Sequence, residues 1–288
     1  QEVEALYKKN KNLSNLKLNN LSLKGLYLVD AKMKNCELEK VDFENASMYG
    51  IDLSGSNLFK ANFENANLKN ANLEKCNLLG ANFNNSQLEN INWGKDCKVV
   101  NELEAEKALS NGDTSTANKK YKEAEDVYRN IKISLQNQTL GNDTGTFFIR
   151  EMISRRKQFN KFSTARIGSK IIEITTGYGE KLGNIIFTII GTILFCMILY
   201  GIEGVKYGDP IHGDRIIGFF SDDLQQYGLL NTLGNLFYFS VVVYSTVGFG
   251  EMLPVGPIGK TTMIFEGLTG GLVLAILIIA LYKKTMDR

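Results

Sequence analysis

Large apolar residues recur at every fifth position along the first third of the chain, from Lys11 to Lys95 without a break. They are Leu13, Leu18, Leu23, Leu28, Met33, Leu38, Phe43, Met48, Leu53, Leu58, Phe63, Leu68, Leu73, Leu78, Phe83, Leu88 and Trp93. A second inward candidate, often alanine, stands two positions before each, with Asn or Asp commonly between the two, as in Ala61-Asn62-Phe63. A period of five fits neither the 3.6 of a helix nor the 2 of a flat strand. It predicts a solenoid whose chain turns a corner every five residues.

This segment resembles the pentapeptide-repeat family, whose members coil as a right-handed, four-sided β-helix. With four pentads per coil, the repeats would form a column on the order of 20 Å tall, at about 4.8 Å per coil. We assign residues 1–97 to this domain. Leu16, Leu21 and Leu26 replace the small residues in the early pentads, which indicates a wider first coil or one that covers the open end. Trp93 is expected to cap the other end.

Helical spacing follows the repeats. Three helices are expected, at residues 103–109, 116–138 and 147–159. The second places Tyr121, Ala124, Tyr128, Ile131 and Leu135 on one stripe. A turn is expected at 141–143, with Asp143 or Thr144 as the N-cap of the third helix. The pattern resembles one helical hairpin of tetratricopeptide type, and we assign residues 98–180 to a helical hairpin linker that ends in an interfacial helix.

Basic residues gather at the end of this linker. They are Arg150, Arg155, Arg156, Lys157, Lys161, Arg166 and Lys170. Positive charge next to a spanning helix is typical of the cytoplasmic side of a membrane. Ile167, Ile171 and Ile174 share one face of a short helix, with Lys170 and Glu173 turned away, which is typical of a helix in the membrane interface.

Three apolar segments fill the last hundred residues. Residues 182–202 and 257–282 are long enough to cross a bilayer of about 30 Å. Residues 232–245 are too few to cross it, which predicts a re-entrant helix. Irregular backbone at that depth is tolerated where it lines a water-filled path. The sequence therefore predicts a membrane pore lined by the irregular backbone that follows the re-entrant helix.

The segment Thr246, Val247, Gly248, Phe249 and Gly250 follows the re-entrant helix. Glycine at alternate positions allows successive carbonyl oxygens to face one axis, as in the Thr-Val-Gly-Tyr-Gly loop that replaces the hydration shell of potassium. Residues 182–283 thus resemble the pore module of two-transmembrane-helix potassium channels. The resemblance implies an all-α pore domain over 181–288, with outer helix 182–202, pore helix 232–245, filter 246–250 and inner helix 257–282. K⁺, the permeant ion, would bind at Thr246, Val247, Gly248 and Phe249, and a closed ring of carbonyls would need a homotetramer.

Departures from the usual motif concern the support of the filter. Phe249 replaces the commoner Tyr and removes a hydroxyl, and Glu251 replaces the Asp often found after the last glycine. Val242 stands where some relatives carry a bracing carboxylate. We expect Ser245, Glu251 and Glu266 to support the filter, since a carboxylate inside a membrane helix is costly unless it is paired or functional.

Glycines follow Glu266 directly. Gly267, Gly270 and Gly271 form either a hinge for opening or a set of small residues for close helix packing. The sequence leaves both readings open.

The loop between outer and pore helices is acidic, opposite to the basic linker. This asymmetry predicts that both termini lie in the cytoplasm. The resemblance to potassium channels implies a pore in the plasma (inner) membrane of a prokaryotic cell. His212, in this loop, is expected to be an ordinary loop residue.

Composition narrows the class of function. The chain has 288 residues, a net charge of +2 and a mean hydropathy of −0.13, with polar residues early and apolar residues late. Near balance of charge along the repeats argues against mimicry of DNA, and no nucleic-acid partner is expected. No catalytic cluster is visible, so we expect no enzyme and no cofactor. The start shows no secretory signal, and the missing initiator Met indicates a trimmed or partial chain.

Three functions remain after these arguments. The first is a potassium-selective channel with a cytoplasmic repeat domain that serves as a scaffold or gating element and offers a surface to an unidentified protein partner. The second is a non-selective monovalent cation channel. The third is a membrane-tethered scaffold or interaction protein.

Overall fold

The computed structural model describes residues 2–138, 141–209 and 213–286. It divides into two compact units, the first up to Ile171 and the second from Ile172 to Thr285.

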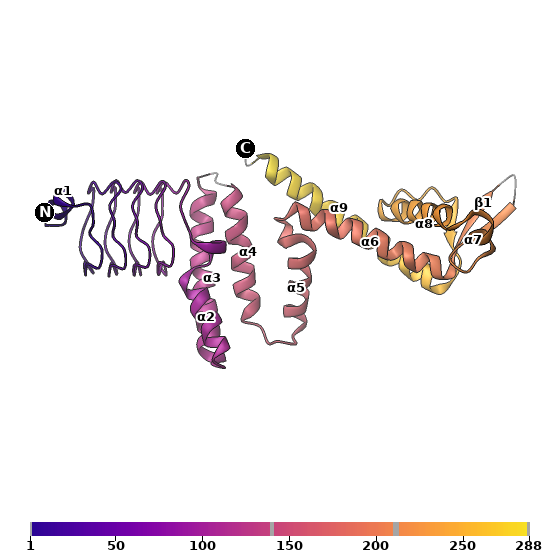
Figure 1. The fold of residues 1–288 in the computed structure, drawn as a ribbon, viewed down its shortest axis with the longest axis horizontal. Coiled ribbons are helices and arrows are strands. Elements are labelled where there is room, and N and C mark those ends of the chain that lie inside the picture. Colours follow the sequence, from indigo (N-terminus) through magenta and orange to yellow (C-terminus); the bar gives the residue numbers. More distant parts are fainter. Residues whose placement is uncertain (1, 139–140, 210–212, 287–288) are drawn as a thin grey trace. The chain divides into compact units, whose positions relative to one another are not determined.

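The first unit is built on stacked coils. Each β-bridge joins residues twenty positions apart in parallel, from Asn12 with Lys32 to Asn72 with Asn92. Twenty residues per coil means four pentads per coil, as predicted. Figure 1 shows these coils following one another along the stack.

Corners of the coils use a left-handed backbone at every fifth residue. The non-glycine residues with positive φ between 15 and 90 are Asn15, Asn20, Asp30, Asn35, Lys40, Asn45, Lys60, Asn65, Asn70, Lys75, Asn85 and Asn90, and glycines fill the other corners. Glycine, Asn and Asp adopt this conformation at low cost. The recurrence of Gly, Asn and Asp at every fifth position is a turn signal, which the prediction from hydrophobic residues did not use.

Apolar side chains fill the inside of the coils. Phe43, Phe63 and Phe83 stack with ring centroids 5.3 Å apart and planes 5° apart. The stack forms because the same position recurs once per coil. All three rings are buried, so the repeats make their own core.

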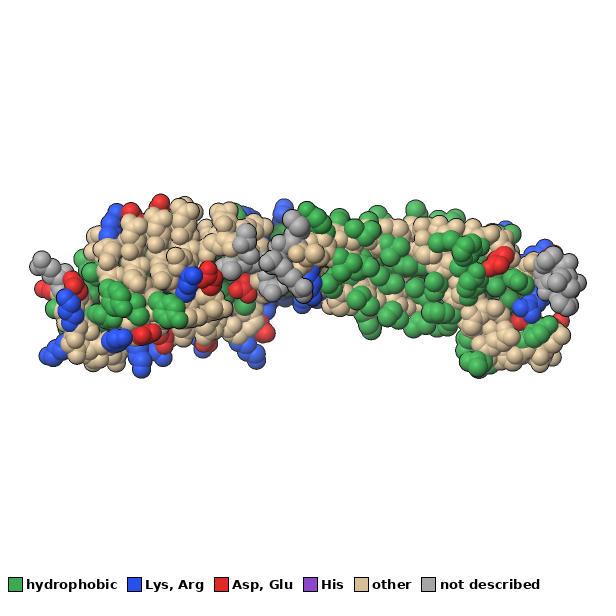
Figure 2. Space-filling model, turned by 90° about the horizontal axis from the view of Figure 1, so that it is seen from above, with side chains coloured by type: hydrophobic (Ala, Val, Ile, Leu, Met, Phe, Trp, Pro, Cys, Tyr) green, Lys and Arg blue, Asp and Glu red, His purple; other side chains and the backbone are tan. Residues whose placement is uncertain are grey.

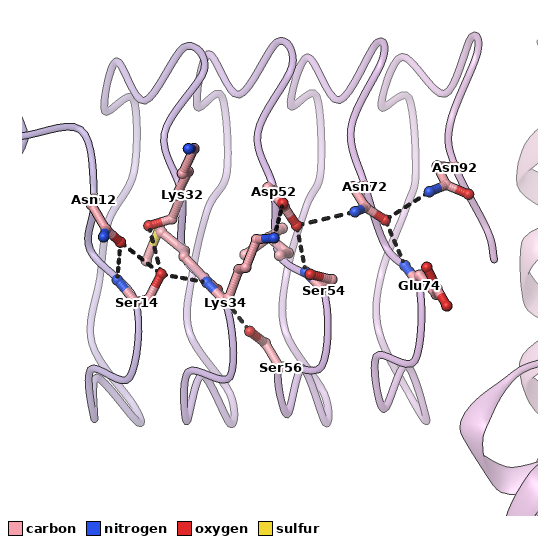
Figure 3. Close-up of polar contacts among 12 residues, drawn as sticks. Asn12, Ser14, Lys32, Lys34, Asp52, Ser54, Ser56, Asn72, Glu74 and Asn92 are labelled. Atoms are coloured by element: carbon pink, nitrogen blue, oxygen red, sulfur yellow. Dashed lines mark hydrogen bonds and ion pairs between the residues drawn. The ribbon is translucent and has the colours of Figure 1, made fainter.

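Polar side chains form a second ladder outside the coils, shown in Figure 3. Asn92 Nδ2 donates to Asn72 Oδ1, and Asn72 Nδ2 donates to Asp52 Oδ1, each at 3.1 Å. Lys34 Nζ lies 3.0 Å from Asp52 Oδ2. The Asn and Asp positions between the inward residues therefore bond one coil to the next.

Helix α1 (Glu2–Lys9) covers the first coil, which the sequence analysis did not predict. Val3 of α1 is buried in the repeat core, and Tyr7 Oη donates to the carbonyl of Val29 at 2.9 Å. Leu16 and Leu26 pack partly against the core, whereas Leu21 is 45 % exposed. The open end is thus closed by a helix as well as by larger apolar side chains.

The other end of the stack meets a helical hairpin. A 3₁₀ turn at Lys95–Cys97 leads to α2 (Val100–Ser110), α3 (Thr114–Gln136) and α4 (Gly141–Lys157). Trp93 lies against Phe83 on one side and Phe147 of α4 on the other, with centroids 6.5 and 5.1 Å away. The expected cap at Trp93 is confirmed, and α4 continues the aromatic stack.

One local prediction in the hairpin was wrong. The residues taken for a turn, 141–143, form the first turn of α4, so Asp143 and Thr144 lie inside the helix and neither is its N-cap. An acidic residue such as Asp143 suits a helix N-terminus, because it faces the positive end of the helix dipole. Turn composition and helix-start composition are similar here, so the sequence did not separate them.

The second unit contains most of the predicted apolar elements. Its elements run α5 (Thr164–Thr176, which begins in the first unit), a 3₁₀ turn (Gly177–Gly179), α6 (Leu182–Glu203), β1 (Val205–Asp209), β2 (Gly213–Ile217), α7 (Asp222–Tyr227), α8 (Leu229–Tyr244), β3 (Met252–Pro254) and α9 (Pro257–Met286). The strands form one antiparallel sheet in the order β2-β1-β3. The all-α expectation was therefore wrong in this loop. His212 lies outside the described residues.

Two helices in the described part of the chain, α6 and α9, are long and apolar enough to cross a membrane. Their apolar side chains point outward: Phe187 is 79 % exposed and Leu268 is 67 % exposed. Figure 2 shows hydrophobic side chains spread over the visible face of these helices. Helix α8 is apolar but has only 16 residues. These lengths agree with two spans and one shorter helix.

Candidate ion-conduction site

The segment from Thr246 to Gly250 begins where α8 ends. The N–H groups of Thr246 and Val247 still donate to carbonyls of α8, those of Val243 and Val242, at 3.0 and 3.2 Å. The segment is therefore anchored to the C-terminus of a short apolar helix. That end of a helix carries the negative part of its dipole, which favours a cation nearby.

Backbone angles alternate along the segment. Thr246, Gly248 and Gly250 have φ of 58°, 58° and 80°, whereas Val247 and Phe249 are not among the positive-φ residues. Glycine tolerates this conformation, but a β-branched residue such as Thr246 does so at a cost. Strain of this kind is typical of functional segments. Alternation of the backbone is what a row of carbonyl oxygens facing one axis requires.

Side chains of the segment are open to their surroundings in the single chain. Val247 is 55 % exposed and Phe249 is 66 % exposed. The Thr246 hydroxyl donates to the Ser245 carbonyl at 2.7 Å. An apolar, exposed segment at the end of a half-buried helix indicates a surface that other molecules cover.

Ser245 and Glu251 flank the segment and bond to different partners. The Ser245 hydroxyl donates to the Val242 carbonyl of α8 at 3.1 Å, so it closes the end of the helix. Glu251 Oε1 accepts from the Tyr238 hydroxyl at 2.5 Å. Tyr238 on α8 was not singled out from the sequence, although a Tyr in an apolar helix before this motif is a usable signal.

The sheet holds the residue that follows the segment. The carbonyl of Glu251 accepts from Gly208 N–H at 3.2 Å. Strand β3 begins at Met252 and pairs with β1, where Met252 lies opposite Tyr207. The exit of the segment is thus fixed to the loop between the two long helices.

Glu266 lies in α9 and is fully buried. Its Oε2 accepts from the Tyr200 hydroxyl of α6 at 2.8 Å, and its Oε1 accepts from the Ser240 hydroxyl of α8 at 2.5 Å. One carboxylate therefore joins α6, α8 and α9. It contacts the short helix, and neither of these hydrogen bonds reaches residues 246–250. Tyr200 and Ser240 were missed, because isolated hydroxyls in apolar helices carry no periodic signal.

The three glycines after Glu266 differ in their surroundings. A Cβ at Gly270 would collide with the backbone of Tyr244, at the end of α8. A Cβ at Gly267 or Gly271 would meet nothing within 4 Å. Close packing therefore accounts for Gly270, and the hinge stays a prediction for the other two.

Both ends of α9 are tied to α6 or to the turn before it. Glu203 Oε2, at the end of α6, accepts from Gly259 N–H in the first turn of α9 at 2.9 Å. Lys283 Nζ, in the last turns of α9, lies 2.6 Å from Glu180 Oε1, next to the Gly177–Gly179 turn. Each charge suits the helix end that it meets, because the dipole favours an anion at the N-terminus and a cation at the C-terminus.

Comparison with known families agrees with this two-part architecture. Residues 22–58, 36–74 and 56–92 match the family of pentapeptide repeats, and residues 215–286 match an ion-channel family. The chain joins pentapeptide repeats to an ion-channel domain. Residues 246–250, α8 and α9 all lie within the part of the chain that matches the ion-channel family.

One curated relative is the inward rectifier potassium channel Kirbac3.1 of Paramagnetospirillum magnetotacticum, 30 % identical over 96 residues. The match covers 33 % of this chain and 28 % of the relative, so the chain spans well under half of that protein. Solved structures similar to this chain include pentapeptide repeat proteins from Nostoc PCC 7120 (24 % identity, 30 % of this chain and 72 % of that chain, TM-score 0.29) and from Cyanothece 51142 (21 % identity, 31 % and 92 %, TM-score 0.20).

Proposed function

We propose that four copies of this chain form a potassium-selective channel that conducts K⁺ passively and catalyses no reaction. The observation that carries the proposal is the segment Thr246–Gly250, with its alternating backbone, at the C-terminus of a short apolar helix. Four such segments would surround one axis with carbonyl oxygens that replace the water around K⁺. K⁺ would bind at Thr246, Val247, Gly248 and Phe249.

A fourfold assembly would bury the exposed segment 246–250 against its copies in the other three chains. One chain supplies one row of carbonyls, and Val247 and Phe249 are exposed in it. Symmetric oligomers are the common solution for such rings. In the tetramer, α6 and α9 would cross the plasma membrane, with both termini in the cytoplasm, where α5 would lie in the interface with Ile167, Ile171 and Ile174 toward lipid.

Glu251 and Glu266 support the filter in this proposal by holding α8 from two sides. Glu251 is bonded through Tyr238, and Glu266 through Ser240 and Tyr200. Since Glu266 also ties α8 to α9, it fixes the pore helix to the helix that would open. Glu266→Gln keeps one acceptor and should retain selectivity, whereas Glu266→Leu should lose it or fail to assemble.

The repeat domain serves as a cytoplasmic scaffold or gating element. Its covalent path to the pore runs through α5 and the Gly177–Gly179 turn, beside the Glu180–Lys283 ion pair. A force on α5 would therefore reach the last turns of α9. A protein partner on the repeats would act along the same path.

Potassium release from liposomes tests the proposal. Protein reconstituted into vesicles loaded with K⁺ should release it when a proton ionophore balances the charge. Gly248→Ala, which places a side chain where φ is positive, should abolish release, while a change outside the filter, Leu268→Ala on the exposed face of α9, should preserve it. A wild-type protein that assembles in the membrane but releases nothing would favour the membrane-tethered scaffold.

A further inference from the structure

A cavity of about 760 Å³ lies in the second unit between the end of α6, strand β2 and helix α7. Its volume is within the range of small-molecule sites, about 300–1,000 Å³. Four carboxylates, those of Glu203, Asp214, Asp222 and Asp223, line it against one guanidinium, that of Arg215. The lining excludes every residue of the proposed filter.

Asp223 is the buried carboxylate of this cavity. Its side chain is 3 % exposed, and neither of its oxygens accepts a hydrogen bond from any residue that the structure describes. The nearest opposite charge is Arg215 Nη1, 3.6 Å from Oδ1. A buried carboxylate without a hydrogen-bond donor is costly, and buried polar atoms nearly always have a partner. Asp223 therefore points to a donor that enters the cavity from outside.

Other carboxylates of the cavity already have partners or lie in the open. Asp214 Oδ2 lies 2.5 Å from Lys206 Nζ, and Glu203 accepts from the backbone of Gly259. Asp222 is exposed at the rim. Among the described carboxylates of the cavity, Asp223 is thus the one that is buried and lacks a hydrogen-bond donor.

Arg215, the ion-pair partner of Asp223, also lies against two aromatic rings, and its Nε has no hydrogen-bond partner among the described residues. Its guanidinium carbon lies 5.2 Å from the ring centroid of Tyr207 and 4.8 Å from that of Tyr227. Cation–π attraction to the two rings adds to the ion pair with Asp223. A further cation in the cavity would find another aromatic face at Phe220, which borders the cavity and is 87 % exposed.

We propose that this cavity binds an organic cation with N–H donors, a primary diamine or polyamine. One ammonium group donates to the Asp223 oxygens, and the rest of the molecule lies against Phe220 toward the negative charge of Asp222. The excess of carboxylates selects for a cation, and the size of the cavity together with its aromatic wall selects for an organic one.

The occupied cavity would be coupled to the filter through the sheet. Strand β2 carries Arg215 and pairs with β1, and β1 pairs with β3 directly after the filter. Tyr207, under Arg215, lies opposite Met252. A bound amine that fixes Arg215 and α7 thus stabilises the strand that holds the exit of the filter.

Titration calorimetry of the purified full chain with spermidine tests binding without any ion flux. We expect saturable binding at one site per chain. Asp223→Asn should weaken it by at least about tenfold, because it removes a charge-assisted hydrogen bond. Asp222→Asn is the matched control, an adjacent exposed carboxylate on the same helix, and should weaken binding by less than about threefold. Tetramethylammonium, which has no N–H donor, should bind at least about tenfold more weakly than spermidine.

Phe220→Ala is a second variant, which should still fold because an exposed ring can be removed without disturbing the core. It should weaken spermidine binding by about threefold. Equal losses for Asp222→Asn and Asp223→Asn would show diffuse attraction and overturn the proposal, as would absence of binding to the wild type or full competition by Mg²⁺ at matched concentration. Because the readout is heat of binding, a channel that fails to conduct K⁺ would leave the result standing.

Discussion

The first unit turns its large apolar side chains inward, and the second turns many of them outward. Leu28, Phe43 and Phe63 are fully buried in the coils, whereas Phe187 and Leu268 stand on open faces of α6 and α9. The repeats bury their own core because each coil covers the next. The helices of the second unit have more apolar surface than one chain can cover, which indicates a surrounding lipid phase and neighbouring copies.

Separating the units should give the largest effect. A polypeptide of residues 1–160 should be soluble and monodisperse without detergent, because its core is complete. A polypeptide of residues 172–288 should aggregate unless detergent or lipid is present. Light scattering with and without detergent measures both. A soluble second unit would contradict the comparison, since its outward side chains would then need no cover.

Phe63→Ala tests the packing of the first unit. Removing the middle ring of a buried stack should cost about 3–5 kcal/mol of unfolding free energy, through lost burial and a cavity between its neighbours. Urea unfolding of the soluble first unit measures it. The matched control is Phe59→Ala, since Phe59 is only half-buried on the outside of the same coil, and it should cost about 1 kcal/mol or less. Equal costs would argue against a stacked aromatic core.

Gly270→Ala tests the packing of the second unit. A methyl group there meets the backbone at the end of α8, and overpacking should cost about 1–3 kcal/mol and lower conduction. The neighbouring Gly271→Ala meets nothing within 4 Å and should leave thermal stability in detergent nearly unchanged. If Gly271→Ala or Gly267→Ala reduced channel opening more than Gly270→Ala, the hinge would be the better account of these glycines.

Acid should lower the unfolding free energy of the first unit, because it protonates the Asp side chains of the outer ladder. This effect should be smaller than those of separating the units, Phe63→Ala and Gly270→Ala. Burial by itself raises the pKa of Asp52, but hydrogen bonds from Ser54 and the ion pair with Lys34 outweigh it and hold the pKa below its ordinary 3.8. A lowered pKa in the folded state gives stability that is full above 3.8 and lost as pH falls through the lower folded value.

Urea unfolding at pH values between 2 and 6 measures this loss. Asp52→Asn should be less stable than the wild type at neutral pH and should lose less on acidification. A wild type and a variant with parallel pH profiles would show that the ladder does not titrate.

The sequence predicted the regular parts of both units for a physical reason. A five-residue register over many pentads allows one arrangement of inward positions, and apolar segments of spanning length have few alternatives. The turn at every fifth residue, the cap at Trp93, the extent of α6 and the start of α9 therefore followed from pattern alone, whereas the coil of twenty residues came from the resemblance to pentapeptide repeats.

Irregular parts did not follow from pattern. Strands β1, β2 and β3 have three to five residues each, too few for a period of two to be recognised, and β3 pairs with β1 from a distant part of the chain. Helix α1 is explained by the tertiary burial of Val3. At the candidate site, Glu266 was identified because a carboxylate in an apolar helix is conspicuous, but its partners Tyr200 and Ser240 were visible only after folding.

The reversal potential under opposed K⁺ and Na⁺ gradients tests the central claim. The claim is that carbonyl oxygens from four glycine-spaced loops select K⁺ by replacing its hydration shell. With reconstituted full-length chain in a planar bilayer, the potential should move by about 59 mV for each tenfold change in the K⁺ gradient. The reversal potential should not change with the Na⁺ gradient. A potential that stays near zero when Na⁺ replaces K⁺ on one side would contradict the claim and favour the non-selective cation channel.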